Sequence, residues 1–307
     1  MKILLTGATG FIGSHIAEEL IIQGFKVVAL KRSSSDLWRC KSFKHKILWI
    51  DCDNIFDAET EIIKCNPDIL IHAAWSGVSA SDRDNWIEQE KNLTFFVSLL
   101  EIVKKTNISK IIALGSQAEY GSFEGLIDET QPTNPNNAYC AIKVCASVLL
   151  RSFAELYKID WYWIRIFSVF GEGEDSKWLI PAVISKLINN EPIQLTSCEQ
   201  QYNYLYIEDF VSQLLSVVIC KENKSGIYNL CNSESIVLKD LLITIAELMN
   251  VSKDLLKFNE IPQRPGQNMF ISGDNKKFIN SFILKGYEPV GLSSGLQRTI
   301  DYHKKTV

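Results

Sequence analysis

Three glycines spaced three residues apart lie near the start of the chain, and this turn constrains the fold more than any other stretch. The apolar run at residues 3–5 predicts a buried strand, and the amphipathic run at residues 11–20 predicts a helix. Between them, Gly7 allows a sharp turn off the strand, Gly10 lets backbone approach a pyrophosphate, and Gly13 lets the helix sit close to the sheet. Because a helix N-terminus attracts anions, strand, turn and helix in this order predict a nucleotide site.

The composition is that of a globular chain with enough core for independent stability. The 307 residues allow one large or two modest domains, and 46% of them are hydrophobic and 22% charged. A net charge of −4 argues against a nucleic-acid partner. No apolar run approaches the roughly 20 residues that a membrane helix needs. The chain enters a strand at once, which leaves no room for a signal peptide, so we expect a cytoplasmic protein with no membrane partner.

Cysteine and histidine show no pattern that would indicate a metal site. The eight cysteines are scattered without a C-x-x-C pair, and the four histidines lack ligand spacing. We therefore expect buried thiols in a reducing compartment rather than a disulfide or zinc framework.

Strand and helix patterns alternate through roughly the first half of the chain, as a doubly wound parallel sheet requires. The expected fold class is therefore α/β. Beyond the first strand and helix, strands are expected at residues 26–30, 47–50 and 110–114 and from residue 69, with a long helix from about residue 84 to 106.

The end of the second strand bears on the choice of cofactor. A cofactor without a 2′-phosphate usually meets an acidic residue here, which accepts from the ribose hydroxyls. In this chain the strand leads into Lys31, Arg32 and Ser33, a basic and hydroxyl-rich end that suits a 2′-phosphate. NADP(H) is favoured on this ground, with NAD(H) as the alternative if the residues form only a solvated turn. Asp51, before Cys52, can accept from an adenine amino group or be an ordinary loop acid.

The fourth strand leads into small residues. Ala73 and Ala74 would let a cofactor pass close to the backbone, whereas His72 lies in an apolar run and is predicted to pack in the core. Asn92, in the long helix, is either a plain surface amide or a side chain that holds the loop beneath the nicotinamide.

A tyrosine and a lysine four residues apart carry the chemistry. Tyr139 and Lys143 would share one face of a helix, one turn apart. A free tyrosine has a pKa of about 10, and a lysine ammonium one turn away would move that pKa toward neutral pH. Ser116, two residues after the strand at residues 110–114, can supply a hydrogen bond to a substrate oxygen.

These motifs give the chain a family resemblance over nearly its whole length. It resembles the extended short-chain dehydrogenases/reductases, in the branch of nucleotide-sugar epimerases, dehydratases and reductases. The motifs are T-G-x-x-G-F-I-G at residues 6–13, the acid at Asp51, H-A-A at 72–74, S-x-x-x-Y-G at 116–121, Y-x-x-x-K at 139–143, R-x-F-x-V-F-G at 165–171, L-I-P at 179–181, Y-L-Y-I-E-D at 204–209 and R-P-G at 264–266.

The resemblance implies a Rossmann-like doubly wound parallel sheet with a smaller C-terminal α/β substrate domain. Residues 1–166 would form the dinucleotide-binding domain, with 203–233 returning to it. Residues 167–202 and 234–307 would bind a nucleotide-sugar substrate, and a homodimer would form through a four-helix interface.

The resemblance also implies roles for individual residues. The catalytic set would be Ser116, Tyr139 and Lys143. Phe167 would line the nicotinamide, and Arg264 would contact the diphosphate of the sugar nucleotide. The cofactor-binding residues expected are Gly7, Thr9, Gly10, Phe11, Ile12, Gly13, Lys31, Arg32, Ser33, Asp51, Cys52, Ala73, Ala74, Asn92 and Phe167. The substrate-binding residues expected are Trp75, Gln117, Ser168, Leu179, Tyr202 and Arg264; no metal ligand is expected.

Departures from the family pattern narrow the chemistry. Dehydratases carry an Asp-Glu pair after the hydroxyl residue, where this chain has Gln117-Ala118. The 3,5-epimerase-reductases that make fucose nucleotides place a cysteine there and a histidine in a later loop, where this chain has the run 171–173. UDP-sugar C4 epimerases have an acid at the position of Lys31. This chain has Tyr202-Asn203 where family members usually have an Arg-Asp pair whose arginine contacts the diphosphate. We therefore expect the contacts to the phosphates, or the nucleotide itself, to differ from those of other family members.

The leading hypothesis is therefore a plain ketoreductase. It would use NADPH to reduce the 4-keto group of a nucleotide-activated 4-keto-6-deoxyhexose, in deoxysugar biosynthesis for surface polysaccharide. The alternative enzyme is an NAD-dependent nucleotide-sugar C4 epimerase. A non-catalytic dinucleotide sensor on the same fold is a third possibility, against which the intact Ser116, Tyr139 and Lys143 set argues.

Overall fold

A seven-stranded parallel sheet forms the centre of the molecule. The computed structural model describes residues 1–222, 224–263, 268–283 and 287–306. The strand order is β12-β7-β5-β4-β1-β2-β3, and every neighbouring pair is parallel. The strands are β1 (Lys2–Thr6), β2 (Lys26–Lys31), β3 (Leu48–Asp51), β4 (Ile69–His72), β5 (Lys110–Ser116), β7 (Asp160–Ile166) and β12 (Gly226–Leu230). The strand order reverses between β1 and β4, and ligands bind at such switch points in doubly wound sheets.

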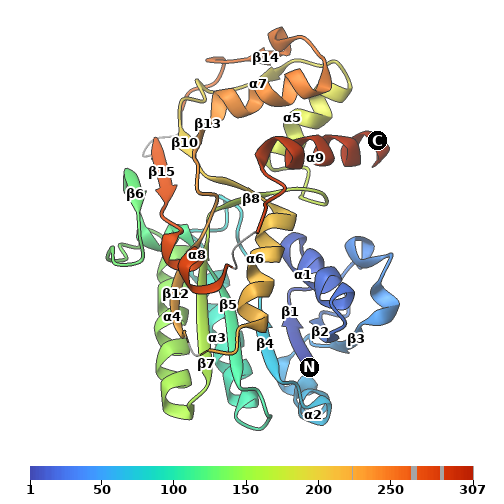
Figure 1. Ribbon diagram of the computed structural model, residues 1–307, viewed down its shortest axis with the longest axis vertical. Helices are drawn as coiled ribbons and strands as arrows, with labels where there is room; N and C mark the ends of the chain where they lie inside the picture. Colours follow the sequence, from blue (N-terminus) through green and yellow to red (C-terminus); the bar gives the residue numbers. More distant parts are fainter. Residues whose placement is uncertain (223, 264–267, 284–286, 307) are drawn as a thin grey trace.

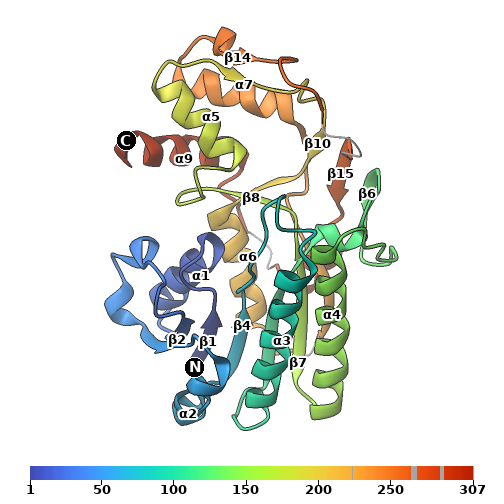
Figure 2. The ribbon, with the colours of Figure 1, turned by 180° about the vertical axis from the view of Figure 1, so that it is seen from behind.

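Helices cover both faces of this sheet, which confirms the predicted Rossmann-like α/β class. Side chains of β1 alternate between two apolar cores, with Ile3 and Leu5 on one face and Leu4 on the other. Figure 1 shows α6 and α1 on the first face, and Figure 2 shows α3 and α4 on the second. The helices are α1 (Phe11–Ile22), α6 (Ile207–Ile219) and α8 (Lys276–Phe282) on the first face, and α2 (Ile55–Cys65), α3 (Trp86–Val103) and α4 (Ala138–Tyr157) on the second.

A smaller group of elements lies beyond the carboxyl ends of the central strands (Figure 1). Its four-stranded sheet has the order β13-β10-β15-β6, and two further strand pairs are β11-β8 and β14-β9. The helices are α5 (Leu179–Ile188), α7 (Leu238–Met249) and α9 (Leu292–Thr306). The strands are β6 (Gly125–Ile127), β8 (Ser168–Phe170), β9 (Ile193–Gln194), β10 (Gln201–Tyr202), β11 (Tyr204–Tyr206), β13 (Ile236–Val237), β14 (Leu256–Lys257) and β15 (Phe270–Gly273).

Two elements cross the domain division expected from the sequence. After residue 203 the chain supplies α6 and β12, and β12 is an edge strand of the large sheet. However, β6 comes from the first 166 residues and pairs with β15 in the small sheet. Conversely, α8 packs on β12, where Phe278 and Phe282 contact Tyr228. The division at residues 166, 203 and 233 stays a prediction.

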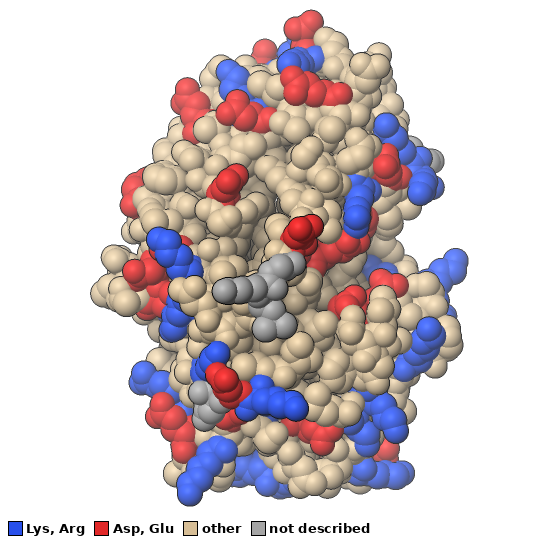
Figure 3. All heavy atoms as spheres, in the orientation of Figure 1, with Lys and Arg blue, Asp and Glu red and all other residues tan. Residues whose placement is uncertain are grey.

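Charged side chains of both signs are interspersed over the face shown in Figure 3. Within the described ranges, the helices all fall short of the length and apolar character that a bilayer crossing needs.

The glycine turn between β1 and α1 is built on close backbone contacts. Gly7 has φ +77°, and a Cβ on it would lie 2.7 Å from the carbonyl carbon of Ala73 and from the amide nitrogen of Ala74. A Cβ on Gly13 would lie 2.0 Å from the Gly7 oxygen. At Gly10 the nearest atom would be 3.3 Å away, so this backbone is the open side of the turn. Gly13 therefore allows α1 to pack onto the turn itself, while Gly10 leaves room for a ligand.

Replacing Gly13 by alanine should destabilise the protein by about 1–3 kcal/mol, because the new methyl group overlaps a backbone oxygen that cannot move freely. Urea unfolding measures this loss. The matched variant is Gly10→Ala, which adds the same methyl group at φ −81° without that overlap. Equal losses of stability in the two variants would contradict this account of the turn.

Candidate active site

Three side chains predicted to act together meet at the carboxyl end of β5. Ser116 is the last residue of β5, and Tyr139 and Lys143 lie in the first two turns of α4. Asn137 is the N-cap of this helix, and its side chain accepts from the amide of Cys140 at 2.9 Å. Ser116, Tyr139 and Lys143 are each less than a tenth exposed. The four-residue spacing thus places tyrosine and lysine on one buried face, as predicted.

The position of Ser116 is fixed by the short helix η3 (Gln117–Tyr120) that follows it. Its amide donates to Oε1 of Glu119 at 2.8 Å, and its hydroxyl oxygen accepts from the amide of Ala118 at 3.1 Å. These two bonds form a capping box, which satisfies amides that the helix start would otherwise leave free. The Ser116 hydroxyl proton is not used in either bond; in the cofactor-free protein the hydroxyl is also hydrogen-bonded to the phenol of Tyr139.

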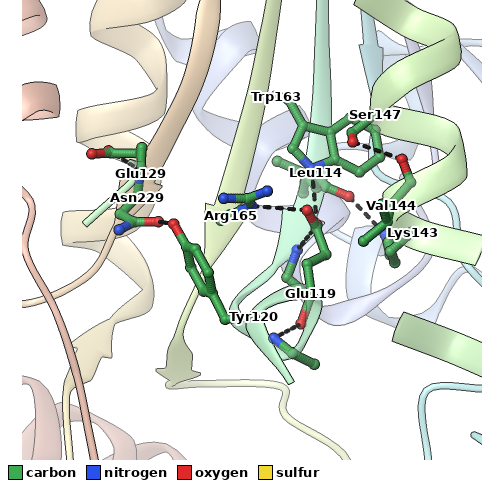
Figure 4. Close-up of polar contacts among 12 residues, drawn as sticks. Leu114, Glu119, Tyr120, Glu129, Lys143, Val144, Ser147, Trp163, Arg165 and Asn229 are labelled. Atoms are coloured by element: carbon green, nitrogen blue, oxygen red, sulfur yellow. Dashed lines mark hydrogen bonds and ion pairs between the residues drawn. The ribbon is translucent and has the colours of Figure 1, made fainter. Parts of the chain in front are cut away.

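Glu119 is a site residue that the sequence analysis missed. Its carboxylate is fully buried and accepts three hydrogen bonds: from the Ser116 amide, from Trp163 Nε1 at 2.9 Å and from Arg165 Nε at 2.8 Å (Figure 4). The Arg165 guanidinium also lies 4.3 Å from the centre of the Tyr120 ring. The only hint in the sequence was that glutamate and arginine both fall inside family motifs.

Burial shifts the protonation of Tyr139 and Lys143 in the cofactor-free protein. Burial lowers the pKa of Lys143 to about 7, and the charge of Glu119 opposes this shift. The Lys143 ammonium donates to the carbonyl oxygen of Leu114 at 2.7 Å and lies 6.0 Å from the centre of the Tyr139 ring.

The expectation that lysine brings the tyrosine pKa toward neutrality is wrong for this state. Burial raises the pKa of Tyr139, and a hydrogen bond from Ser116 and the charge of Arg83 only partly oppose it. Desolvation of the phenolate is the dominant effect, so the phenol keeps its proton at neutral pH.

The loop after β4 is held by α3. Asn92 is buried; its side-chain oxygen accepts from the amide of Ser76 at 2.8 Å, and its nitrogen donates to the Ser76 carbonyl at 3.1 Å. Asn92 is therefore the loop-holding amide and not a surface one. His72 packs in the core as predicted: its Nδ1 lies 2.9 Å from the hydroxyl of Thr6, and burial lowers its pKa to about 3.

The basic strand end is less open to a phosphate than the sequence suggested. Lys31 forms an ion pair with Asp51, opposite it in the β2-β3 register. The Ser33 amide donates to Asp53 at 3.0 Å, a second carboxylate that the sequence analysis did not single out. The Arg32 side chain is exposed and forms no ion pair with any residue in the described ranges. Arg32 is thus the cation best placed to meet a 2′-phosphate.

Cys52 lies just beyond the Lys31–Asp51 pair. It is buried, and its amide donates to the Lys31 carbonyl at 2.7 Å. Burial raises the pKa of its thiol to about 11, so the thiol is neutral at neutral pH. Its role at the cofactor stays a prediction.

The residues of the glycine turn fit a dinucleotide. The backbone at Gly10 is exposed and caps α1, and the first turn of this helix carries no acidic side chain that would repel an anion. Arg39 links the glycine turn to the loop after β8, since its guanidinium donates to the carbonyl of Thr9 at 3.4 Å and to that of Gly173 at 2.8 Å. Phe11 and Ile12, in the first turn of α1, are half-buried.

The expected substrate residues lie on several elements. Phe167 is buried against Gly273, whose Cβ would lie 2.5 Å from the Phe167 ring. The Tyr202 hydroxyl donates to the Asn268 carbonyl at 2.8 Å. Gln117, Ser168 and Leu179 are half-buried, and Arg264 lies outside the described residues. The roles of these residues stay predictions.

Asn203 explains part of the departure from the usual Arg-Asp pair. Its side-chain oxygen accepts from the amide of Gly273 at 2.7 Å, and its nitrogen donates to the carbonyls of Asn232 and Glu234. The neutral amide is therefore a structural link between strands of the small sheet and the loop after β12.

Comparisons with known proteins agree with the fold. A family model described as the NAD dependent epimerase/dehydratase family matches residues 3–231. A dTDP-6-deoxy-L-talose 4-dehydrogenase (NAD(+)) from Aggregatibacter actinomycetemcomitans is 27% identical over 89% of this chain and 99% of that protein. A putative UDP-glucose 4-epimerase from Methanocaldococcus jannaschii is 26% identical over 98% of each chain. Among solved structures, one similar protein is a variant of UDP-glucuronic acid 4-epimerase from Bacillus cereus, bound to NAD and UDP-4-deoxy-4-fluoro-glucuronic acid. The match covers 100% of both chains with a TM-score of 0.89 and 22% identity, which shows a shared fold.

Replacing Glu119 by glutamine should lower the free energy of unfolding by about 3–5 kcal/mol, because the Arg165 charge would stay buried without a counter-charge. The matched control is Glu208→Gln, which breaks the half-exposed pair with Arg298 and should cost less than about 1 kcal/mol. Urea unfolding of both variants measures the difference. A Glu119 variant as stable as the control would refute the importance of the buried pair.

Proposed function

The chain belongs to the NAD-dependent epimerase/dehydratase family, and from this premise we propose that it is a nucleotide-sugar 4-ketoreductase. It reduces the 4-keto group of a nucleotide-activated 4-keto-6-deoxyhexose with NADPH, in deoxysugar biosynthesis for surface polysaccharide. The observation that carries the proposal is the set of Ser116, Tyr139 and Lys143 at the end of β5, followed by Gln117 and Ala118. An amide and a methyl group cannot do the acid–base work that expelling water from a sugar requires.

The protonation of the site suits reduction. When bound, a reduced nicotinamide supplies the hydride for C4. The Ser116 hydroxyl, whose oxygen already accepts from Ala118, donates to the ketone oxygen and so keeps the carbonyl in place. Tyr139 holds its proton because burial raises its pKa, and it gives this proton to the developing alkoxide. The Lys143 ammonium stabilises the phenolate that results.

One relative supports a reaction at C4 of a deoxysugar. The protein from Aggregatibacter actinomycetemcomitans is described as a 4-dehydrogenase of dTDP-6-deoxy-L-talose. Oxidation at C4 of a 6-deoxyhexose is the reverse of the reduction proposed here. The same catalytic groups serve both directions, because the tyrosine that protonates the alkoxide is the one that would accept the hydroxyl proton.

The alternative is an NAD-dependent nucleotide-sugar C4 epimerase. The ion pair between Lys31 and Asp51 favours it, because that pair leaves Arg32 as the remaining cation of the strand end. Epimerases also stand among the relatives. The two activities differ in how the cofactor is held: an epimerase must retain NAD through the catalytic cycle, whereas a reductase releases the oxidised cofactor after each turnover.

We further propose that the protein is a homodimer joined through α3 and α4. These helices pack side by side and expose large apolar side chains to solvent, which is unusual for an unpartnered surface. On α4, Val148, Leu149 and Leu156 follow a helical spacing, and Val97 is exposed on α3. Two copies of this pair would form a four-helix interface.

The proposed activity is tested by NADPH oxidation with nucleotide-linked 4-keto-6-deoxyhexoses, with the product's C4 configuration determined by NMR. Tyr139→Phe should lower turnover at least tenfold and leave cofactor affinity nearly unchanged, because the phenol donates the proton and its ring remains. Fluorescence titration measures that affinity. Purified protein that carries tightly bound NAD and interconverts C4 epimers without NADPH consumption would replace the proposal by the epimerase.

Replacing Arg32 by alanine should raise the Michaelis constant for NADPH about tenfold or more and change that for NADH little. A charge-assisted hydrogen bond to the 2′-phosphate contributes roughly 1.5–3 kcal/mol, which corresponds to about 10–150-fold in affinity. Lys31→Ala is the comparison, and its effect should be smaller because Asp51 already engages that ammonium. Wild-type preference for NADH, or a parallel rise in both constants for Arg32→Ala, would rule out the phosphate site.

Replacing Leu149 by aspartate should convert the dimer to a monomer, because the interface would then bury an unpaired carboxylate. Gel filtration with light scattering measures the mass. Ile22→Asp places the same charge on α1, where Ile22 is 68% exposed, and should leave the dimer intact. Wild-type protein that is monomeric at micromolar concentration would contradict the proposal.

A further inference from the structure

Trp75, in the loop after β4, covers one side of the Lys143 ammonium with its ring. The Lys143 nitrogen lies 3.6 Å from the centre of the Trp75 ring, much closer than to the rings of Trp163 and Tyr139, which are 5.9 and 6.0 Å away. The same indole meets the Tyr139 ring edge-to-face, with centroids 6.3 Å apart and planes at 85°. Trp75 thus touches the proposed proton donor and the lysine beside it.

The indole is held in this position by a buried amide of α3. Trp75 Nε1 donates to Oε1 of Gln89 at 3.0 Å, and Gln89 is 0% exposed. The Gln89 nitrogen donates to the Gly77 carbonyl at 2.7 Å. Gly77 has φ +69°, and a Cβ there would lie 2.5 Å from that nitrogen, so the loop needs glycine for the amide to fit.

We propose that Trp75 is a positioning residue: the face of its indole ring holds the Lys143 side chain in place and keeps it charged inside a buried site. The role rests on the proposed function in so far as Lys143 must be a cation to stabilise the phenolate of Tyr139. A ring face attracts an ammonium most strongly where water is excluded. Trp75 therefore offsets part of the desolvation that pulls Lys143 toward its neutral form.

Of the other titratable groups around Lys143, only Glu119 favours its charged form. His72 at the end of β4 is neutral, because burial lowers its pKa to about 3. Tyr139, on the same helix, keeps its proton at neutral pH, since burial raises its pKa. Glu119 in η3 does act on Lys143, but its carboxylate binds Arg165 directly. The Leu114 carbonyl accepts from the ammonium on one side, and the indole covers another.

The test measures the titration of Lys143 in the cofactor-free protein. Protein labelled with ¹³C at the lysine ε-carbons is titrated by NMR, and the Lys143 signal is assigned by its loss in Lys143→Met. Trp75→Leu removes the ring face and should lower the midpoint by about 0.4–1.5 pH units, the range that measured cation–π energies imply. Trp75→Phe keeps a ring and should shift it less. Trp86→Leu, at a 61% exposed tryptophan, should titrate as wild type.

The possible outcomes separate the two proposals. A midpoint unchanged in Trp75→Leu, an equal shift in Trp75→Leu and Trp75→Phe, or an upward shift would overturn the role of the ring face. Circular dichroism checks folding, and Trp75→Met replaces the leucine variant if that one does not fold. Failure of NADPH oxidation with every 4-keto sugar would remove the proposed function, yet the Lys143 titration would still decide the role of Trp75.

Discussion

The buried ion pair between Glu119 and Arg165 is the interaction on which the site depends. Two charges removed from water are tolerated only where their hydrogen-bonding capacity is met, and here the carboxylate accepts three bonds. One of them comes from the Ser116 amide, so the carboxylate that neutralises Arg165 also holds the last residue of β5. Arg165 belongs to β7 and is opposite Gly115 in the register of the sheet. The pair therefore ties the hydroxyl residue to the neighbouring strand.

Burial also explains why tyrosine and lysine have the protonation states that the structure gives them. Tyr139 and Lys143 lie on a rigid helix, and each loses hydration there, so one pKa rises and the other falls. Both shifts favour the neutral forms before a cofactor binds. A charged partner entering the site would change this balance, which makes the cofactor part of the electrostatics as well as a reagent. The amides of α3 complete the enclosure by fixing the loop that carries Trp75.

Local patterns in the sequence predict the parts of this arrangement that depend on neighbours along the chain. The glycine turn, the alternation of strands and helices, and the four-residue spacing of Tyr139 and Lys143 are all local, and all are found in the structure. The ion pair of Lys31 with Asp51 depends on the register between two strands, which no local pattern encodes. The direction of the Tyr139 pKa depends on burial by residues distant in the sequence. For the same reason Gln89 and Glu119 escaped notice, since each looks like an ordinary polar residue of a helix.

The path of the chain through β6 gives the molecule a mechanical property. The segment between Ser116 and Tyr139 leaves the large sheet, contributes β6 to the small sheet, and comes back to begin α4. The segment that joins Ser116 to Tyr139 thus connects the large sheet to the small sheet. A hinge motion of the small sheet would pull on η3 and on the first turn of α4 at once. The Ser116 hydroxyl and the Tyr139 phenol would then move together, so the position of the small sheet and the geometry of the catalytic pair are coupled through β6.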